Sequence, residues 1–402
     1  MHTLPHPHQL PPHQPPPHQP PSHQPPPGPE ATASTWTPSG PAFATPYLDL
    51  DVGAAVTRFR RLAAALPGTA VHYAVKANPD PSLLAALAHA GCRFDVASPA
   101  EVAATLEAGA VPGDLIYSNP VKRRADIESA ARLGVRLFAV DSLEETQKVA
   151  AAAPGSAVLC RIVTTGAGAS WSLSGKFGCS PHQAVHLLRS AAVSGLDAAG
   201  ISFHVGSQQQ DPHAWDTPIR TAAEVLAALG VEDCTRFLLD LGGGFPAHLE
   251  GDTPPLPAYG AAIEQSLRRH FGDSRPRTVV EPGRAVVADA GTLVATVVAV
   301  VRRGGTRWVY LDAGVFSGLV ETLDEAIRYR IRTSRDGGPT GPCVVAGPTC
   351  DSADVLYEKN AYPMPVSLAI GDKVLIEATG AYTTTYSSVG FNGYPPLKQY
   401  VI

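Results

Sequence analysis

The feature that most constrains the fold of this chain is a regular alternation of strand-like and helix-like segments between residues 71 and 281. The strand-like segments are short apolar runs bounded by glycine, proline or polar residues, at 71–76, 93–97, 115–118, 137–141, 157–163, 200–205, 237–241 and 278–281. Alanine- and leucine-rich stretches that favour helices separate them, at 82–90, 99–109, 123–133, 143–152, 181–195, 214–229 and 257–271. This pattern predicts an α/β fold, a (β/α)8 barrel.

Polar or glycine residues stand where the predicted strands stop. They are Lys76, Asp95, Asn119, Asp141, Arg161, His204, Gly242-Gly243-Gly244, and Glu281 with Arg284. The carboxyl ends of barrel strands meet at one rim, where active sites are built. A capping aspartate, a tight turn or a surface ion pair explains any one of these residues, but not the whole series. We therefore predict an active site at this rim.

The segments flanking the barrel have a different character. Short β-rich runs at 308–311, 343–346 and 373–377 alternate with glycine and proline, which predicts an all-β carboxyl-terminal domain. We place the barrel at 46–285 and the β domain at 36–45 plus 286–402, and we expect the segment Thr45–Leu50 to pair with the β domain.

Residues 1–35 form a third segment, rich in histidine, glutamine and proline. HQPPP-type units repeat from residue 8 to 27 and offer little apolar surface to bury, so we expect a disordered tail. Its spaced histidines are compatible with weak metal binding, but a passive tail is the favoured interpretation.

Composition excludes several classes of function. The net charge of −5 and pI near 6.3 argue against nucleic acid and anionic membrane as partners. The six cysteines show no CxxC or other metal-ligand spacing, and they fit a reducing cytoplasm. No apolar amino-terminal segment supports secretion, and the longest apolar run, 293–301, suits a buried strand and is too short to cross a bilayer.

Lys76 ends the first strand-like run and is followed by the breaker Ala77-Asn78-Pro79. A lysine at the last strand position does not easily reach solvent, so we expect its ammonium to be paired or its pKa to be depressed. A desolvated lysine is the residue type that forms Schiff bases with aldehydes. A lysine extending to the edge of a sheet is the structural alternative, and the segment alone does not decide between them.

Three elements together predict a phosphate site. Gly242-Gly243-Gly244 lets backbone N–H groups approach an anion, Gly283-Arg284 adds an amide and a guanidinium, and Ser207 adds a hydroxyl. The chain has no Walker lysine–serine pair, which favours a small phosphorylated cofactor over a nucleotide. With Lys76, the cofactor suggested is pyridoxal 5'-phosphate, with Glu281 as partner of the pyridine nitrogen and His204 stacked on the ring.

These residues stand in motifs that resemble a known family. The motifs are YAVKANPDP, FDVASPAE, FHVGSQ, LDLGGGFP, VVEPGR, GPTCDSAD and GAYT…FNGYPP, in this order between residues 42 and 400. They resemble the barrel-type pyridoxal-phosphate decarboxylases of ornithine, lysine, arginine and diaminopimelate, and the bacterial ornithine decarboxylases most of all. The resemblance implies the same barrel and β domain, the same cofactor and a decarboxylation of an amino acid.

The resemblance also implies a role for individual residues. Lys76 looks like the Schiff-base lysine and Glu281 like the pyridinium partner, with Asp95, Arg161 and His204 at the cofactor. The implied phosphate ligands are Ser207, Gly244, Gly283, Arg284 and Tyr382, and Gly242 and Gly243 are further candidates for cofactor binding. Cys350 resembles the cysteine that protonates the substrate carbon, and Asp351 the carboxylate that receives the distal ammonium. In the family these two residues enter the other subunit's site, which implies a homodimer with shared sites.

The substrate is less closely defined than the reaction. Asp351 stands where the diaminopimelate decarboxylases have glutamate, and its charge favours a basic amino acid over an apolar one. Ornithine, giving putrescine, is the favoured substrate, and lysine, giving cadaverine, differs by one methylene, worth about 1–3 kcal/mol. Asp324, within one residue of register, is the candidate for a second ammonium ligand, with a surface acid as the alternative.

Other functions fit the residues less well. Decarboxylation of diaminopimelate, arginine or valine remains open within the same family. A racemase needs a second base opposite the lysine and has no use for Cys350-Asp351. A non-catalytic homologue that regulates polyamine synthesis typically lacks the lysine, the cysteine or the phosphate ligands, and this chain keeps all of them.

Overall fold

A computed structural model describes residues 43–171 and 175–402 of the chain. The predicted tail, residues 1–35, lies outside the described residues. Residues 42–402 form one compact unit, which contains a closed barrel of parallel strands and an eight-stranded sheet.

The barrel consists of all eight predicted strands. They are β2 (Thr69–Ala74), β3 (Arg93–Val96), β4 (Leu115–Tyr117), β5 (Leu137–Val140), β6 (Ala157–Arg161), β8 (Asp197–Ser202), β10 (Leu238–Asp240) and β11 (Arg277–Val280). Each pairs in parallel with its neighbours, and β11 closes the barrel onto β2. The predicted (β/α)8 architecture is therefore confirmed.

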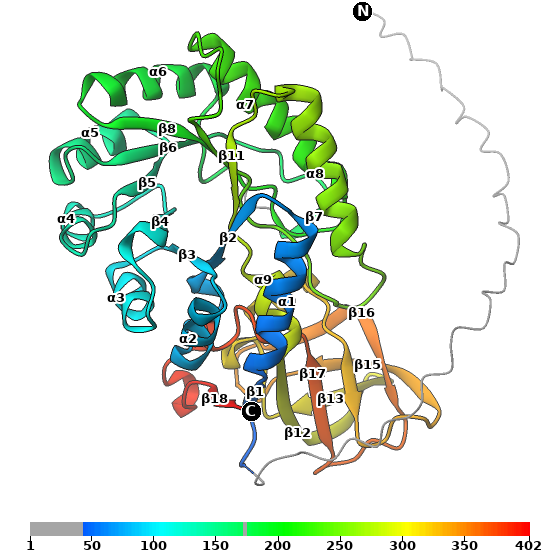
Figure 1. Cartoon of the computed structure of the whole chain (residues 1–402). Helices are drawn as coiled ribbons and strands as arrows, with labels where there is room; N and C mark the ends of the chain where they lie inside the picture. The colour runs from blue at the N-terminus through cyan, green and yellow to red at the C-terminus, as the bar shows by residue number, and fades with distance from the viewer. Residues whose placement is uncertain (1–42, 172–174) are drawn as a thin grey trace, which may run out of the picture. The chain divides into compact units, whose positions relative to one another are not determined.

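Helices follow the strands and lie outside them (Figure 1). They are α2 (Pro81–His89), α3 (Pro99–Glu107), α4 (Arg124–Arg132), α5 (Leu143–Ala152), α6 (Pro181–Val193), α7 (Asp216–Ala228), α8 (Leu256–Phe271) and α9 (Arg284–Val287). Side-chain caps fix several starts: Asp80, Ser98 and Ser142 accept from first-turn N–H groups, and Ser180 forms a capping box with Gln183. Helix α1 (Val52–Ala65), capped by Asp51, was not predicted.

The strand period of two decides which side chains enter the barrel. Ile116, Leu159 and Val279 form a small buried cluster with residues of neighbouring strands, separate from the large core beneath the helices. The residue two positions after each of these therefore also points into the barrel, closer to the carboxyl rim. Arg161 follows Leu159, and Glu281 follows Val279 in this way.

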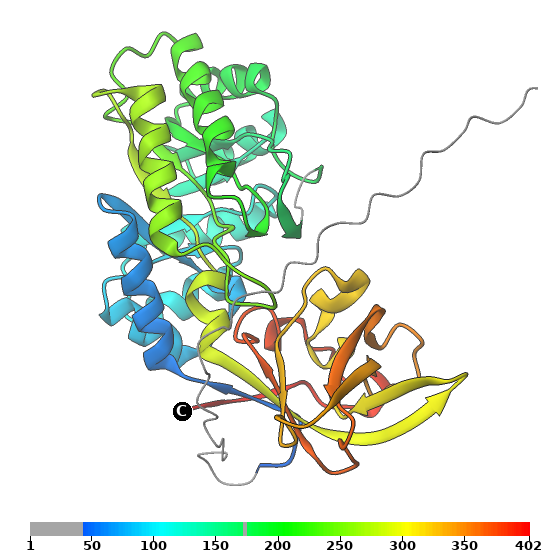
Figure 2. The same ribbon diagram turned by 90° about the vertical axis from the view of Figure 1, so that its right-hand side faces the viewer.

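The second sheet is built mainly from residues after 290 (Figure 2, yellow to red). Its strands are β1 (Tyr47–Leu50), β12 (Gly291–Arg303), β13 (Thr306–Leu311), β14 (Ile331–Thr333), β15 (Thr340–Ala346), β16 (Val355–Pro365), β17 (Lys373–Glu377) and β18 (Lys398–Val401). Strand β1 pairs with β12 and β18, so the segment Thr45–Leu50 joins this sheet as predicted. The exact domain boundaries remain predictions.

Two loops connect the barrel rim to the second sheet. The Asn78 amide donates to the Gly380 carbonyl (2.9 Å) and to Gln399 Oε1 (2.8 Å). Tyr382 N–H donates to the Ala77 carbonyl (2.8 Å). These bonds place Tyr382 beside the turn that carries Lys76.

Candidate active site

Most of the residues predicted for the site lie at the carboxyl rim of the barrel. Asp95 lies within β3 and Arg161 ends β6, whereas His204 and Glu281 follow β8 and β11. Lys76 lies in a 3-10 turn, η1 (Val75–Ala77), two residues beyond the end of β2. The expected last strand position for Lys76 is therefore corrected to the first turn after the strand.

Lys76 is ion-paired with Asp95. Its Nζ lies 2.6 Å from Asp95 Oδ2, and the two side chains are 47% and 1% exposed. Burial alone would lower the pKa of Lys76, but the charges of Asp95, Tyr382 and Glu281 outweigh it and raise the pKa. Of the two alternatives expected from the sequence, ion pairing is found and a depressed pKa is not. Asp95 Oδ1 is buried without a partner.

A second group of buried acids lies beside this pair. Glu281 accepts a short hydrogen bond from the Ser118 hydroxyl, and its carboxyl lies close enough to that of Asp240 for each to shift the pKa of the other. Burial, then the charges of Asp240 and Asp95, raise the pKa of Glu281 well above its ordinary value. The site therefore holds more carboxyl groups than cations, which suits a cationic ring nitrogen.

His204 is held as a neutral imidazole. Its Nδ1 accepts the Gly206 N–H (3.0 Å), so the proton of the neutral ring lies on Nε2. Burial, with the charges of Arg161 and Lys76, lowers the pKa of His204 well below its ordinary value. A neutral ring held in place in this way can lie against another flat ring without adding charge to the site.

Arg284 is the centre of the predicted anion site. Its buried guanidinium contacts Ser207 Oγ through Nε and Nη2 (3.2 Å each) and Glu321 Oε1 through Nη2 (2.5 Å). The Tyr382 ring centroid lies 5.2 Å from its Cζ. Nη1 is buried and has no hydrogen-bond partner among the residues that the structure describes. One donor of a fully enclosed arginine is therefore free for an anion.

The glycines at this rim are required by close approach. A Cβ on Gly243 would lie 2.7 Å from the Glu281 carbonyl oxygen and 2.9 Å from His204 Nε2, and one on Gly283 would lie 2.8 Å from the Tyr382 hydroxyl. Gly244 has φ of 109°, in the region that favours glycine. Backbone thus lines the space between these side chains, as the predicted cradle requires.

Cys350 and Asp351 lie in an exposed turn before β16. The turn is fixed by Asp354, which accepts the N–H groups of Thr349 (2.9 Å) and Val315 (2.8 Å). Asn392 Oδ1 accepts the Cys350 N–H (2.9 Å). Across residues 43–171 and 175–402, no hydrogen bond or ion pair joins Cys350 or Asp351 to the barrel rim, so this chain alone does not bring them to Lys76.

Asp324 also stays apart from the rim residues. Its carboxylate is 91% exposed and pairs with Lys359 Nζ (2.8 Å). Asp324 and its neighbour Glu325 both have left-handed backbone, with φ of 55° and 59°. Such conformations in non-glycine residues are costly and gather at functional sites. The role of Asp324 as an ammonium ligand remains a prediction.

Sequence reasoning missed three residues of the site. Ser118 ends a predicted strand, and Asp240 stands in the LDLGGG motif, so both carried the strand-end signal. Glu321 carried no such signal, because its contact with Arg284 joins segments 37 residues apart. Asn119 and Asp141, both in the predicted series, accept hydrogen bonds from backbone N–H groups instead: Asn119 Oδ1 from Val121, two residues on, and Asp141 Oδ2 from Gly178, 37 residues on.

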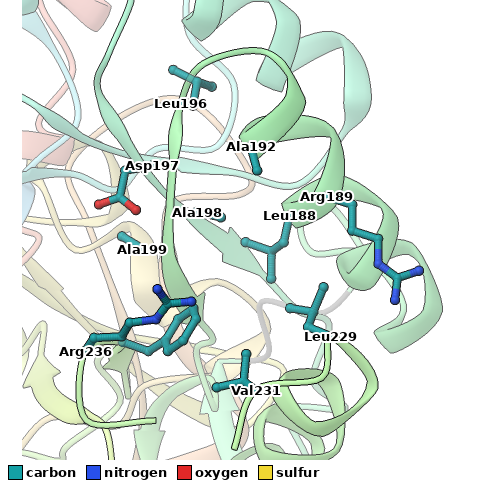
Figure 3. Close-up of a pocket in the computed structure, with 11 residues that line it drawn as sticks. Leu188, Arg189, Ala192, Leu196, Asp197, Ala198, Ala199, Leu229, Val231 and Arg236 are labelled. Carbon is teal, nitrogen blue, oxygen red and sulfur yellow. The ribbon is translucent and has the colours of Figure 1, made fainter. Parts of the chain in front are cut away.

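A cavity of about 420 Å³ lies at the opposite end of the barrel (Figure 3). Leu188 and Ala192 of α6, the start of β8, and residues 229–237 line it. Amino-terminal ends of strands form this face, whereas the chemistry of barrels lies at the carboxyl ends. We therefore assign the site to the rim around Lys76 rather than to this cavity.

Within residues 43–171 and 175–402, no three histidine, cysteine or acidic side chains gather as a metal site. In the same part of the chain, no helix is long and apolar enough to cross a membrane.

Comparison with known proteins agrees with this site. Residues 52–288 match the family described as pyridoxal-dependent decarboxylase, pyridoxal binding domain. A lysine/ornithine decarboxylase of Selenomonas ruminantium is 36% identical over 351 residues, which cover 87% of this chain and 88% of that protein.

Solved structures share the whole described fold. A lysine/ornithine decarboxylase from Vibrio vulnificus, complexed with cadaverine, superposes with a TM-score of 0.80 at 33% identity, covering 90% of this chain and 95% of that one. The arginine decarboxylase of Paramecium bursaria Chlorella virus, bound to agmatine, gives a TM-score of 0.82 at 27% identity, covering 90% and 96%.

Proposed function

The chain belongs to the family of pyridoxal-dependent decarboxylases, and from this premise we propose that it decarboxylates L-ornithine to putrescine and carbon dioxide. Membership establishes a pyridoxal-phosphate-dependent carboxy-lyase for basic amino acids. The choice of ornithine is the proposal, and lysine, giving cadaverine, is its alternative.

The observation that carries the proposal is the isolated charge of Asp351. Its carboxylate lies one residue from Cys350 on an exposed turn, and its one side-chain hydrogen bond is from the Ala353 N–H (2.9 Å). Among the described residues, no lysine, arginine or histidine pairs with it. A substrate with a terminal ammonium supplies the missing cation, whereas an apolar amino acid leaves the carboxylate unpaired.

The rim fits pyridoxal phosphate on independent grounds. The unpartnered Arg284 Nη1, the Ser207 hydroxyl and the backbone at Gly244 offer donors for a phosphate. Lys76 and Asp95 are 19 positions apart in the sequence and form an ion pair. This pair holds the Lys76 amine at the same rim as the phosphate donors. The excess of buried carboxyl groups at Glu281 suits a protonated ring nitrogen.

In this proposal each residue has a chemical task. The bound cofactor supplies an electron sink for the carbon that loses carbon dioxide. Lys76 provides the amine that holds the aldehyde group, and its ion pair with Asp95 keeps that amine in position. Glu281 holds the proton at the ring nitrogen, and neutral His204 covers the ring face. Cys350 delivers a proton to the product carbon.

We propose that the active enzyme is a homodimer with two shared sites. The motif of Cys350 and Asp351 supports this, together with their exposure and, within residues 43–171 and 175–402, the lack of hydrogen bonds or ion pairs from them to the rim. A second copy that brings this turn to the first chain's Lys76 completes each site. The free thiols of all six cysteines support the proposed cytoplasmic location.

Asp324 is the residue proposed to discriminate between ornithine and lysine. Its exposed carboxylate stands on a strained turn and is free to exchange Lys359 for a substrate ammonium. One methylene changes the distance between the α-carbon and that ammonium, and about 1–3 kcal/mol of discrimination is available from this difference.

The test is carbon dioxide release from the full chain loaded with pyridoxal phosphate. Ornithine, lysine, arginine, diaminopimelate, valine and norvaline are the substrates. We expect the highest kcat/KM with ornithine and a lower value with lysine. A higher value with diaminopimelate, valine or norvaline than with ornithine and lysine contradicts the proposal.

Two variants sharpen this test. Asp351→Asn should cost about 1.5–3 kcal/mol of transition-state stabilisation with ornithine, because the charge-assisted hydrogen bond to the distal ammonium is lost, but little with norvaline, which has no distal ammonium. Asp273→Asn, at an exposed acid after α8, is the matched control and should change neither rate.

A non-catalytic regulatory homologue is the second candidate. Retention of Lys76, Cys350 and Arg284 disfavours it. Carbon dioxide release with any basic amino acid in the panel separates the two candidates, since a non-catalytic homologue releases none.

A further inference from the structure

Asp240 is a buried acid that the proposed reaction does not use. It ends β10, is 1% exposed, and points along the inward row of Leu238. Its Oδ1 accepts the Gly242 N–H (2.9 Å), and its buried carboxyl and that of Glu281 are close enough for each to shift the pKa of the other. The backbone fixes this proximity, because Leu241 N–H donates to Val279 and Glu281 N–H donates to Gly242 (2.9 Å each).

Two carboxyl groups form a hydrogen bond only when one of them carries a proton. Both groups are enclosed, so neither is relieved by water, and two charges at this distance repel strongly. The charged groups that face the pair are Asp95 of β3, Arg161 of β6 and Lys76 of the turn after β2. Asp95 already takes the Lys76 ammonium. The remaining cation, Arg161, does not form an ion pair with either acid in the described chain.

We propose that Asp240 is a positioning residue that shares one proton with Glu281, so that the two acids together carry a single negative charge toward the ring nitrogen of the cofactor. The role assigned to Glu281 rests on the proposed function. The shared proton itself concerns Asp240 and Glu281 alone.

The chemistry of the pair supports this assignment. Burial raises the pKa of Asp240 to about 7, and burial with the Asp240 charge raises that of Glu281 further. The Ser118 hydroxyl donates to Glu281 Oε1 and thereby orients the carboxyl. Without Asp240, the Glu281 carboxyl keeps the Ser118 hydrogen bond alone and is no longer held in place toward the ring nitrogen.

The Asp240→Asn variant separates the charge of the pair from the sharing of its proton. In Asp240→Asn the amide oxygen still accepts the Gly242 N–H, and the NH2 group donates to an ionised Glu281, so the pair keeps one negative charge. In Asp240→Ala both bonds disappear. Asp240→Asn should therefore bind pyridoxal phosphate with a Kd within about threefold of the wild-type value. Asp240→Ala should bind it at least about tenfold more weakly than wild type, which corresponds to about 1.4 kcal/mol or more.

The experiment has two readouts besides activity. Infrared spectra of the full chain without cofactor should contain the carbonyl stretch of a protonated carboxylic acid that is missing in Asp240→Asn and Glu281→Gln. Titration with pyridoxal phosphate, followed by absorbance, gives the Kd, and the shift of 15N-labelled cofactor reports protonation of its ring nitrogen. We expect a protonated nitrogen in wild type and Asp240→Asn, and an unprotonated one in Asp240→Ala.

Equal loss of affinity in Asp240→Asn and Asp240→Ala overturns the proposal, as does an infrared spectrum unchanged by Asp240→Asn. Where the alanine variant does not fold, Asp240→Ser replaces it, and the infrared comparison decides in either case. A chain that passes the infrared test but decarboxylates no basic amino acid contradicts the proposed function and leaves the shared proton standing.

Discussion

Arg284 Nη2 and Glu321 Oε1 lie 2.5 Å apart, and their ion pair joins the first residue of α9 in the barrel to the turn η6 (Val320–Glu325), which carries Asp324. Both side chains are almost fully enclosed, 3% and 6% exposed. Burial alone would lower the pKa of Arg284, but Glu321 outweighs it and raises the pKa. The Arg284–Glu321 ion pair thus connects the candidate phosphate ligand, Arg284, to the turn that carries the candidate ammonium ligand, Asp324.

Replacing Glu321 should therefore destabilise the protein. Glu321→Ala leaves a buried guanidinium without its counter-charge, which should reduce the free energy of unfolding by about 3–5 kcal/mol. Urea unfolding of the full chain measures it. The control is Glu224→Ala, which removes the exposed Arg220–Glu224 pair of α7 and should change stability by about 1 kcal/mol or less. Equal effects would show that the Arg284 pair contributes no more than a surface pair.

Replacing Lys76 should remove the colour of the enzyme. Lys76→Ala has no amine at the rim to join the aldehyde, so the visible absorption band of the lysine-bound cofactor should disappear. The matched control is Lys148→Ala, which also removes an ion-paired lysine, from Glu145 of α5 (2.6 Å). An unchanged spectrum in Lys76→Ala would falsify the assignment of this lysine.

Mixing two inactive variants tests the shared sites. Lys76→Ala and Cys350→Ala subunits should each be inactive alone. Random dimers of the two should recover about a quarter of the wild-type rate, because half of them are mixed and each mixed dimer has one intact site of two. Carbon dioxide release measures the recovery. A mixture that forms heterodimers but stays inactive rules out sharing of these two residues between subunits.

Lys122 should make stability depend on pH above neutrality. Its side chain is fully enclosed, and its Nζ contacts Glu145 (3.0 Å) and the Ala139 carbonyl (2.6 Å). Burial lowers the pKa of Lys122 to about 8, and the Glu145 charge offsets part of the effect.

The sign follows from linkage. In the unfolded chain Lys122 binds its proton up to the ordinary lysine pKa, about 10.4, so between pH 8 and that value the unfolded state binds more protons. The contribution of Lys122 to stability therefore rises with pH in this window, by about 3 kcal/mol in total. Unfolding of wild type and Lys122→Met at several pH values isolates the contribution as their difference. A difference that is constant from pH 7 to 10.5 contradicts the shifted pKa.

The barrel was accessible from sequence because its signals are local. Buried parallel strands are short apolar runs, and their helices are alanine-rich and begin at caps such as Ser98 and Ser180. Helix α1 escaped prediction although Asp51 caps it, since it precedes the first barrel strand and belongs to no strand-then-helix unit. Lys76 was predicted at the end of the strand but lies in the turn η1 that follows it. The prediction was wrong because Ala74-Val75-Lys76 continues the apolar alternation although the backbone already turns there.

The sequence by itself determined which polar residues reach the rim, since every strand of a parallel barrel ends at the same face and residues two apart share a side. Only the tertiary structure decided the partners: Lys76 with Asp95, Arg284 with Glu321, and Asp240 with Glu281. Each pair joins different strands or different sheets, so it depends on the paths of loops and on close backbone approach at Gly243 and Gly283. Local patterns carry no record of such contacts, because each joins residues that are distant in the sequence and that meet only when the barrel and the second sheet have formed.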